Sequence, residues 1–317
     1  MSYYKDKVVV VTGSANGIGM GIAEEIGNRG GRVVLVDILE DDLNKTVARL
    51  KEKGSDVVGY PMDVTVEEDW PKLRDFVLDK YGRIDILFNN AGIMYAKPNK
   101  CFQTIDWMYY FKANVLAAVF GCNTFAPVME KQGGGHICTT GSTASLGPNG
   151  GDGIGVPYSP TKAAVLTYME QFAVQQAMDG TNVTCSCVMP CVINTDIGLR
   201  IDNPLSVPLE FRDKLDIIDN RPPEAVKAAH DTYDALHLPK DHPIYQQFRE
   251  GGVIEIEEGV EIILREIEKG YFYIYTHPGL SAAVNRVEMM RRLTPYSQPV
   301  SIAETMGEFN VKAWERS

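Results

Sequence analysis

The sequence lacks any apolar run long enough to span a bilayer, and it contains no C-x-x-C pair. Its six cysteines are scattered, which argues against both a zinc site and a disulfide framework. Acidic residues outnumber basic ones, 42 to 31, and the net charge of −11 comes without any block of like charges. We therefore expect no nucleic-acid partner and no membrane partner, because nucleic acid and anionic lipid carry the same sign of charge.

What the chain does contain is the composition of a globular protein, with 44% hydrophobic and 23% charged residues. A length of 317 residues is ample for a large core. The first residues run straight into an apolar stretch and show no signal-peptide pattern, so we expect a cytoplasmic location and free thiols.

Short apolar runs alternate with segments of helical periodicity along most of the chain. The runs that predict strands are Val8–Thr12, Arg32–Asp37, Asp56–Tyr60, Ile84–Asn89, His136–Thr140, Val183–Met189 and Tyr271–Tyr275. The segments that predict helices are Gly19–Arg29, Glu40–Lys53, Glu67–Tyr81, Thr104–Lys131, Tyr158–Met178 and Glu258–Lys269. This βαβα order predicts an α/β fold: a doubly wound, mostly parallel, Rossmann-like sheet in one domain over residues 1–317.

Two segments depart from the alternation. Residues 196–257 are rich in proline and lack a clear strand, although Glu224–Leu236 has the periodicity of a helix. The segment also carries aromatic side chains, namely Phe211, Tyr233, Tyr245 and Phe248. Because a long connection with apolar content is more typical of a lid than of a disordered linker, we predict a substrate-lid insertion. Residues 276–317, with a helical pattern at Leu280–Leu293, are predicted to form a C-terminal extension.

A glycine-rich turn joins the first predicted strand to the first predicted helix. It reads Thr-Gly-Ser-Ala-Asn-Gly-Ile-Gly and contains Gly13, Asn16, Gly17, Ile18 and Gly19. Glycines at such a turn let the backbone approach a pyrophosphate, which then lies at the helix N-terminus. The spacing is G-x-x-x-G-x-G, not the common G-x-G-x-x-G.

Asp37 ends the second predicted strand, where a carboxylate can accept hydrogen bonds from the adenosine ribose and repel a 2′-phosphate. No basic residue stands at Ser14, Ala15 or Asn16 inside the loop, and Ile38 follows the acid. The sequence therefore favours NAD over NADP. The alternative for Asp37 is an ordinary helix N-cap.

Tyr158 and Lys162 are spaced i, i+4 on a predicted helix, so their side chains share one face. A cation near a phenol favours the phenolate and lowers its pKa, which suits tyrosine for acid–base work. The spacing alone is common by chance, and its meaning depends on the neighbouring motifs.

Together these motifs resemble the short-chain dehydrogenase/reductase family, in the single-domain branch with T-G-x-x-x-G-x-G and Y-x-x-x-K. The likeness is close over about residues 5 to 195 and looser at Glu258–Tyr275. It implies four catalytic residues, Asn114, Ser142, Tyr158 and Lys162. It also implies cofactor contacts from Gly13, Asn16, Gly17, Ile18, Gly19, Asp37, Asp63, Val64, Asn90, Ala91, Gly92, Tyr158, Lys162, Pro190, Val192 and Thr195, and no metal.

Two positions depart from the family pattern. Counting back from Tyr158 by the family's usual spacing lands on Ser145, whereas aligning from the end of the preceding strand selects Ser142, which we prefer. The difference falls in the loop Gly147–Gly155, where Asp152 is expected to be a turn residue. Cys191 follows Pro190, where the family usually has glycine, so local access to the nicotinamide is expected to differ.

The resemblance implies an NAD-dependent oxidoreductase that interconverts a secondary alcohol and a ketone, and a homodimer or homotetramer. The lid aromatics, with Ile93, Met94 and Tyr95, suggest a bulky apolar or aromatic substrate. A loose likeness to bacterial family members that oxidise benzylic alcohols of lignin-derived aryl compounds suggests one class; steroid-type and other secondary alcohols are alternatives. A cofactor-binding regulator without catalysis and an epimerase or dehydratase of the extended branch are the competing readings.

Overall fold

The computed structural model describes residues 2–95, 101–146, 156–197, 204–212, 214–215, 227, 231, 234 and 237–277. Its seven strands form one parallel sheet in the order β3-β2-β1-β4-β5-β6-β7. The strands are β1 (Val8–Thr12), β2 (Arg32–Asp37), β3 (Asp56–Pro61), β4 (Ile86–Asn89), β5 (Gly135–Thr140), β6 (Val183–Met189) and β7 (Tyr273–Tyr275). The predicted α/β fold is confirmed.

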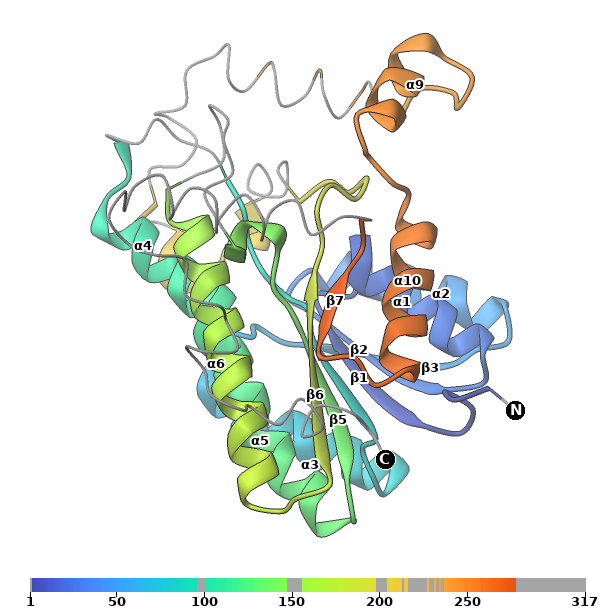
Figure 1. Ribbon diagram of the computed structural model, residues 1–317, viewed down its shortest axis with the longest axis vertical. Helices are drawn as coiled ribbons and strands as arrows, with labels where there is room; N and C mark the ends of the chain where they lie inside the picture. The colour runs from blue at the N-terminus through green and yellow to red at the C-terminus, as the bar shows by residue number, and fades with distance from the viewer. Residues whose placement is uncertain are drawn as a thin grey trace, which may run out of the picture.

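Helices cover both faces of this sheet (Figure 1). The longer ones are α1 (Gly17–Asn28), α2 (Glu40–Glu52), α3 (Trp70–Tyr81), α4 (Thr104–Phe111), α5 (Ala117–Lys131), α6 (Tyr158–Met178), α9 (Pro243–Glu250) and α10 (Ile256–Glu268). The short ones are η1 (Glu67–Asp69), the π turn η3 (Lys112–Leu116), η4 (Thr143–Leu146), η6 (Pro204–Ser206) and α7 (Leu209–Arg212). Figure 1 shows α3, α5 and α6 on one face and α1, α2 and α10 on the other.

The alternation of side chains along β1 explains why two separate cores form. Val8 and Val10 pack with the helices α3, α5 and α6, whereas Val9 and Val11 pack with α1, α2 and α10. Successive residues of a strand point to opposite faces, so an all-valine strand is buried on both sides. All four valines are fully buried.

Two predicted strands begin later than the sequence pattern indicates. At β4, the main-chain N–H and C=O of Ile84 pair with the side-chain amide of Gln132 and not with a neighbouring strand. At β7, the N–H of Tyr271 bonds to the carbonyl of Glu266 and so ends helix α10. The first residues of both predicted strands therefore bond to the ends of helices, Ile84 to Gln132 after α5 and Tyr271 to Glu266 in α10.

The helix predicted over Thr104–Lys131 is interrupted. A π turn, Lys112–Leu116, separates α4 from α5. Helix α10 starts earlier than predicted, at Ile256, because Glu255 and Glu258 form a capping box at its first turn.

The predicted lid, 196–257, is only partly described. Its described residues form η6, α7 and α9 but also one parallel bridge, in which Ile254 pairs with Ile193. Of the predicted helix Glu224–Leu236, the positions described are helical, and they are Lys227, Asp231 and Asp234. Tyr233, the loop Gly147–Gly155 with Asp152, and nearly all of the predicted extension 276–317, including Leu280–Leu293, lie outside the described residues.

Candidate active site at the carboxyl edge of the sheet

The turn between β1 and α1 requires glycine at several positions. Gly13 and Gly17 have φ values of +63° and +58°, a region that favours glycine. A Cβ on Gly19 would lie 2.2 Å from the carbonyl oxygen of Gly13. The N-cap residue Asn16 makes no side-chain capping bond, so the first N–H groups of α1, including Ile18, are not capped by it. This arrangement fits a pyrophosphate lying on the helix N-terminus.

Asp37 holds this turn against β2. Its carboxylate accepts the N–H of Ala15 at 2.9 Å and the N–H of Leu39 at 3.0 Å. Leu39, and not Asp37, is the N-cap of α2. Each carboxylate oxygen has further lone pairs, so the group can accept ribose hydroxyls while it holds the loop.

Asp63 lies at the end of β3, the next strand along the sheet, and is half-buried together with Val64. Its Oδ1 accepts the N–H and the hydroxyl of Thr65, at 2.9 and 2.8 Å. These local bonds fix the carboxyl group of Asp63, a residue for which the resemblance implies a cofactor contact. Asp63 lies two residues after Pro61, which ends β3 and pairs with Asp37 at the end of β2.

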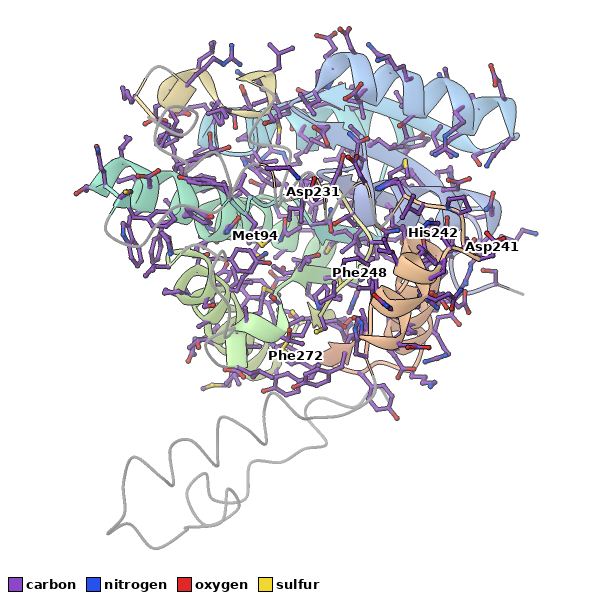
Figure 2. The ribbon with its side chains drawn as sticks, turned by 90° about the horizontal axis from the view of Figure 1, so that it is seen from above. Met94, Asp231, Asp241, His242, Phe248 and Phe272 are labelled. Carbon is purple, nitrogen blue, oxygen red and sulfur yellow. The ribbon has the colours of Figure 1, made fainter. Side chains whose placement is uncertain are left out.

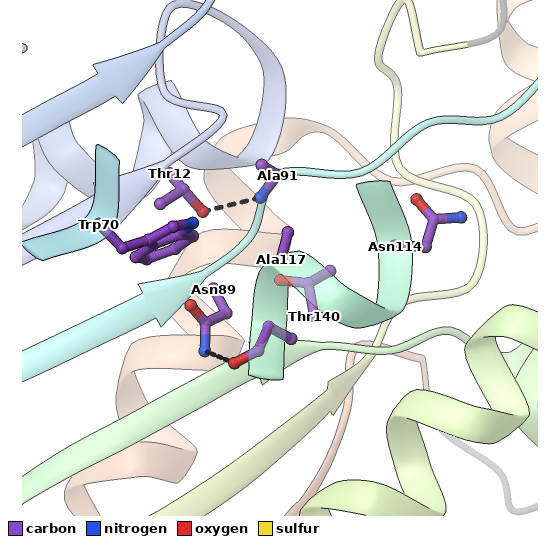
Figure 3. A pocket seen from close by; sticks show the side chains of 8 residues that line it. Thr12, Trp70, Asn89, Ala91, Asn114, Ala117 and Thr140 are labelled. Carbon is purple, nitrogen blue, oxygen red and sulfur yellow. Dashed lines mark hydrogen bonds between the residues drawn. The ribbon is translucent and has the colours of Figure 1, made fainter. Parts of the chain in front are cut away.

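The segment after β4 is tied to β1 through the hydroxyl of Thr12, the first residue of the glycine-rich motif. Thr12 Oγ1 accepts the N–H groups of Asn90 and Ala91, both at 3.0 Å (Figure 3). The amide of Asn90 donates to the carbonyls of Thr12 and Gly13, at 3.0 and 3.2 Å, and its oxygen accepts Thr140 Oγ1 at 3.1 Å. Three strand ends are therefore joined. The sequence marked Thr12 as the end of a strand and the first residue of the T-G-x-x-x-G-x-G motif, but it did not indicate these hydrogen bonds.

Asn114 lies in the π turn and is 3% exposed. Its amide accepts the N–H of Ile93 at 2.7 Å and donates to the carbonyl of Ile93 at 3.1 Å. It also donates to Thr161 Oγ1 at 3.1 Å, and this hydroxyl donates to the carbonyl of Tyr158 at 2.7 Å. Thr161 thus links two predicted catalytic residues, a role without a distinct sequence signal. Asn114 also lines a small cavity behind Ala91 (Figure 3).

The two competing serines have different partners. The side chain of Ser142 lies close enough to the Tyr158 phenol to oppose the rise in its pKa that burial causes. Ser145 Oγ instead donates to the main-chain carbonyl of Lys162 at 2.8 Å and is 1% exposed. These contacts support Ser142 as the residue beside the reacting group and give Ser145 the task of joining η4 to α6.

Burial changes the acid–base properties of the tyrosine–lysine pair. Desolvation raises the pKa of Tyr158, and the hydrogen bond from Ser142 opposes it. Our sequence-based expectation that Lys162 lowers the pKa of Tyr158 is wrong for this structure. The reason is that Nζ of Lys162 donates to the carbonyl of Thr140 at 2.8 Å and lies 5.7 Å from the centre of the tyrosine ring. Desolvation also lowers the pKa of Lys162 from 10.5 to about 8.

The segment after β6 lies against the glycine turn. The nearest atom to a Cβ built on Gly17 would be Thr195 Cγ2, at 3.7 Å. The carbonyl of Pro190 accepts the N–H of Thr143 at 2.9 Å, and the carbonyl of Val192 accepts the N–H of Ile254 at 3.1 Å. The side chain of Cys191 is exposed. Pro190 and Val192, for which the resemblance implies cofactor contacts, are thus joined to η4 and to the end of the predicted lid.

An aromatic cluster packs beside Tyr158. Its buried members are Tyr95, Tyr109, Tyr110, Ala113, Ala144, Tyr158, Val207 and Phe211. The Phe211 ring stacks on Tyr109, with 4.9 Å between ring centres, and Lys112 forms an ion pair with Glu210. The described part of the lid near residue 211 is therefore fixed on α4. In Figure 2, Met94 lies beside α4 and α6, whereas Asp241 and His242 lie at the side of α10.

In the part of the chain that the structure describes, no three His, Cys, Asp or Glu side chains converge on a possible metal position. No helix in the same ranges has both the length and the apolar character needed to cross a membrane. All six cysteines are free thiols, as predicted.

Comparison with known proteins agrees with this geometry. The solved structure of a short chain dehydrogenase/reductase from Burkholderia phymatum in complex with NAD is 26% identical, with a TM-score of 0.77, covering 95% of this chain and 100% of that one. A diacetyl reductase [(S)-acetoin forming] of Staphylococcus epidermidis is 33% identical over 214 residues, 67% of this chain and 80% of the relative.

A 7alpha-hydroxysteroid dehydrogenase of Bacteroides fragilis is 29% identical over 203 residues, 63% of this chain and 76% of the relative. The family model described as short chain dehydrogenase matches residues 7–204, which is more than half of the chain. The glycine-rich turn, the joined strand ends and the buried tyrosine–lysine pair all lie at one edge of a seven-stranded parallel sheet. On this match and this geometry, the chain belongs to the short-chain dehydrogenase/reductase family.

Proposed function

We propose that this protein is an NAD-dependent oxidoreductase that interconverts a secondary alcohol and a ketone. The observation that carries the proposal is that Lys162 and Asn114 converge on the buried Tyr158: Nζ of Lys162 lies 5.7 Å from the centre of the Tyr158 ring, and Asn114 is joined to Tyr158 through Thr161. The side chain of Ser142 also acts on this phenol and opposes the rise in its pKa. Two hydroxyls that meet in a site excluded from water can both contact one substrate oxygen. A bound nicotinamide would supply the acceptor or donor of the hydride.

The protein's own residues move and stabilise the proton. Tyr158 donates its proton to the carbonyl oxygen in the reduction, and as a phenolate it takes the proton of the substrate hydroxyl in the oxidation. Ser142 donates to the same oxygen and stabilises the charge that develops there. Lys162, whose pKa of about 8 is close to neutrality, exchanges its own proton easily. Asn114 and Thr161 keep Tyr158 in place.

The preference for NAD rests on Asp37. Its carboxylate is fixed by Ala15 and Leu39 at the end of β2, where the adenosine ribose of a dinucleotide is expected to lie. A 2′-phosphate would meet a negative charge that cannot turn away without breaking two hydrogen bonds. We expect NAD to exceed NADP in kcat/KM by at least about tenfold, because like-charge contacts cost on the order of several kcal/mol.

The aromatic cluster beside Tyr158 supports a bulky apolar or aromatic substrate, and a benzylic alcohol of a lignin-derived compound fits this description. Steroid-type alcohols are the second candidate, favoured by the similarity to the hydroxysteroid dehydrogenase. Three large apolar side chains, Met108, Phe111 and Leu116, are exposed along α4 and η3, which supports a homodimer or homotetramer. We also propose a cytoplasmic location.

The decisive experiment is a spectrophotometric screen of benzylic, steroid and small secondary alcohols with NAD and NADP in parallel. Tyr158→Phe should lower kcat at least about 100-fold, because general acid–base catalysis contributes about that much. Binding of NAD should be nearly unchanged, because the substitution leaves the glycine turn intact. Tight NAD binding without turnover of any substrate would favour the non-catalytic regulator, and near-normal turnover by the variant would refute the role of Tyr158.

A further inference from the structure

The three residues Ile93–Tyr95 follow the segment after β4 and belong to neither a strand nor a helix. Even so, two side chains bond both main-chain polar groups of the first residue and both of the last. Asn114 binds the N–H and the C=O of Ile93, at 2.7 and 3.1 Å. The hydroxyl of Tyr110 accepts the N–H of Tyr95 and donates to its C=O, both at 2.7 Å.

Tyr110 and Asn114 stand i, i+4 on the same helical run, across the start of the π turn. The Tyr110 side chain is fully buried, and its ring lies 4.7 Å from that of Tyr95. Burial raises the pKa of Tyr110, so its hydroxyl keeps the proton that it donates. A single phenol therefore satisfies both main-chain hydrogen-bonding groups of Tyr95, as a neighbouring strand does in a sheet.

The side chain of Tyr95 is held as firmly as its main chain. Its phenol donates to Oδ1 of Asp106 at 2.9 Å. The other oxygen of this fully buried carboxylate accepts the N–H of Gln103 at 2.8 Å. A buried carboxylate that bonds both a helix N-cap and a phenol has one well-defined position. The segment thus ends at a rigid point on α4.

The same segment borders the reacting residues. A Cβ built on Gly92, which precedes it, would lie 3.5 Å from Nζ of Lys162 and 3.0 Å from Oδ1 of Asn114. Ile93 and Met94 pack against the aromatic cluster that contains Tyr158 (Figure 2 labels Met94). A shift of this backbone by even a fraction of an ångström would change the space beside both catalytic side chains.

We propose that Tyr110 is a positioning residue which, with Asn114, forms a two-point clamp on Ile93–Tyr95 and so fixes the wall of the substrate site beside Tyr158. This inference rests on the proposed function for its kinetic consequence. The clamp itself rests only on the geometry of the described residues, so it can be tested even where turnover is absent.

Tyr109 provides a matched control for Tyr110. It lies on the same helix and in the same cluster, and it is 1% exposed. Its hydroxyl makes one long bond, 3.4 Å, to the carbonyl of Ser206, and no bond to Ile93–Tyr95 is described for it. Tyr109→Phe and Tyr110→Phe thus remove the same atom from similar surroundings, but only the second releases Tyr95.

The test compares wild type and the two variants in steady-state kinetics, NAD binding, thermal unfolding and hydrogen exchange of the Tyr95 amide. For Tyr110→Phe we expect kcat to fall at least about tenfold, with NAD binding unchanged, because both hydrogen bonds that hold the main chain of Tyr95 are lost. Exchange of the Tyr95 amide should accelerate at least about tenfold. Tyr109→Phe should accelerate this exchange by less than about threefold.

Equal kinetic and exchange effects in the two variants would overturn the proposal. So would a Tyr110→Phe protein that is less stable but keeps its kcat and its protected Tyr95 amide, since Tyr110 would then be an ordinary core residue. If Tyr110→Phe does not fold, the wild-type amide decides: the clamp requires Tyr95 to be protected as strongly as strand residues. Failure of the proposed function would differ from both, because wild type would lack turnover while the exchange results still held.

Discussion

The buried lysine should make the stability of this protein depend on pH in a way that one substitution isolates. Lys162 is 4% exposed, and desolvation lowers its pKa from 10.5 to about 8. At about 1.36 kcal/mol per pKa unit, keeping the ammonium in the folded protein costs about 3 kcal/mol relative to the unfolded chain. Lys162→Met removes the charge but keeps an apolar side chain of similar length.

The sign follows from the two pKa values. Below pH 8 the lysine is protonated in both the folded and the unfolded state, and the folded state bears the whole cost. Between pH 8 and 10.5 the folded protein releases the proton while the unfolded chain keeps it, so stability rises with pH. Other titrating groups are common to both proteins and cancel in the difference. Between pH 7 and pH 10, the free energy of unfolding of wild type should therefore rise by about 2 to 3 kcal/mol relative to that of Lys162→Met.

Urea unfolding of both proteins at pH 7, 8, 9 and 10, without cofactor, measures this difference. The hydrogen bond from Lys162 to the Thr140 carbonyl is lost in the variant, and the free carbonyl lowers its stability by a constant amount of about 1 to 3 kcal/mol. This constant shifts the difference but not its slope. A difference that stays flat to within about 0.5 kcal/mol over the whole range would refute the depressed pKa.

Two further predictions concern the turn and the serines. Gly19→Ala places a Cβ 2.2 Å from the Gly13 carbonyl oxygen and 2.6 Å from the Asn90 amide nitrogen, both held by other bonds. The free energy of unfolding should therefore fall by about 1 to 3 kcal/mol, and NAD affinity should fall in a fluorescence titration. An unchanged affinity would contradict the assigned turn. Ser142→Ala should lower kcat by about 100-fold with little change in stability. Ser145→Ala should lower stability by about 1 kcal/mol with little change in kcat. The reverse pattern in kinetics and thermal unfolding would exchange the roles of the two serines.

The sheet could be predicted because its signal is local. An all-apolar run such as Val8–Val11 is compatible with burial on both faces, and the described helices α1 and α3 follow their strands in the expected alternation. The first residues of the strands were harder to predict. Ile84 and Tyr271 are apolar, but the backbone of Ile84 bonds to the side chain of Gln132 and that of Tyr271 bonds to the end of α10. Hydrophobic periodicity carries no information about such partners.

The site was predictable where the chemistry demands one residue type. Glycine at positions 13 and 17 follows from positive φ, and tyrosine and lysine share a helix face. The hydrogen bonds of Thr12, Thr161 and Tyr110 could not be predicted, since a threonine or tyrosine in a packed core looks the same whether or not its hydroxyl bonds a distant backbone. The direction of the Tyr158 pKa also depended on burial, which spacing does not reveal.

The bridge between Ile193 and Ile254 means that the lid leaves the sheet edge and returns to it at one point. Two hydrogen bonds, from Ile254 N–H to the Val192 carbonyl and from Asn194 N–H to the Ile254 carbonyl, join the two ends. Chain between ends that are already adjacent can be lengthened or shortened at a closure cost that grows only by about 0.6 kcal/mol per doubling. We therefore expect the predicted lid to be replaceable as one segment. Replacing it whole should change the substrate range, while the strand ends, the glycine turn and the tyrosine–lysine pair stay as they are.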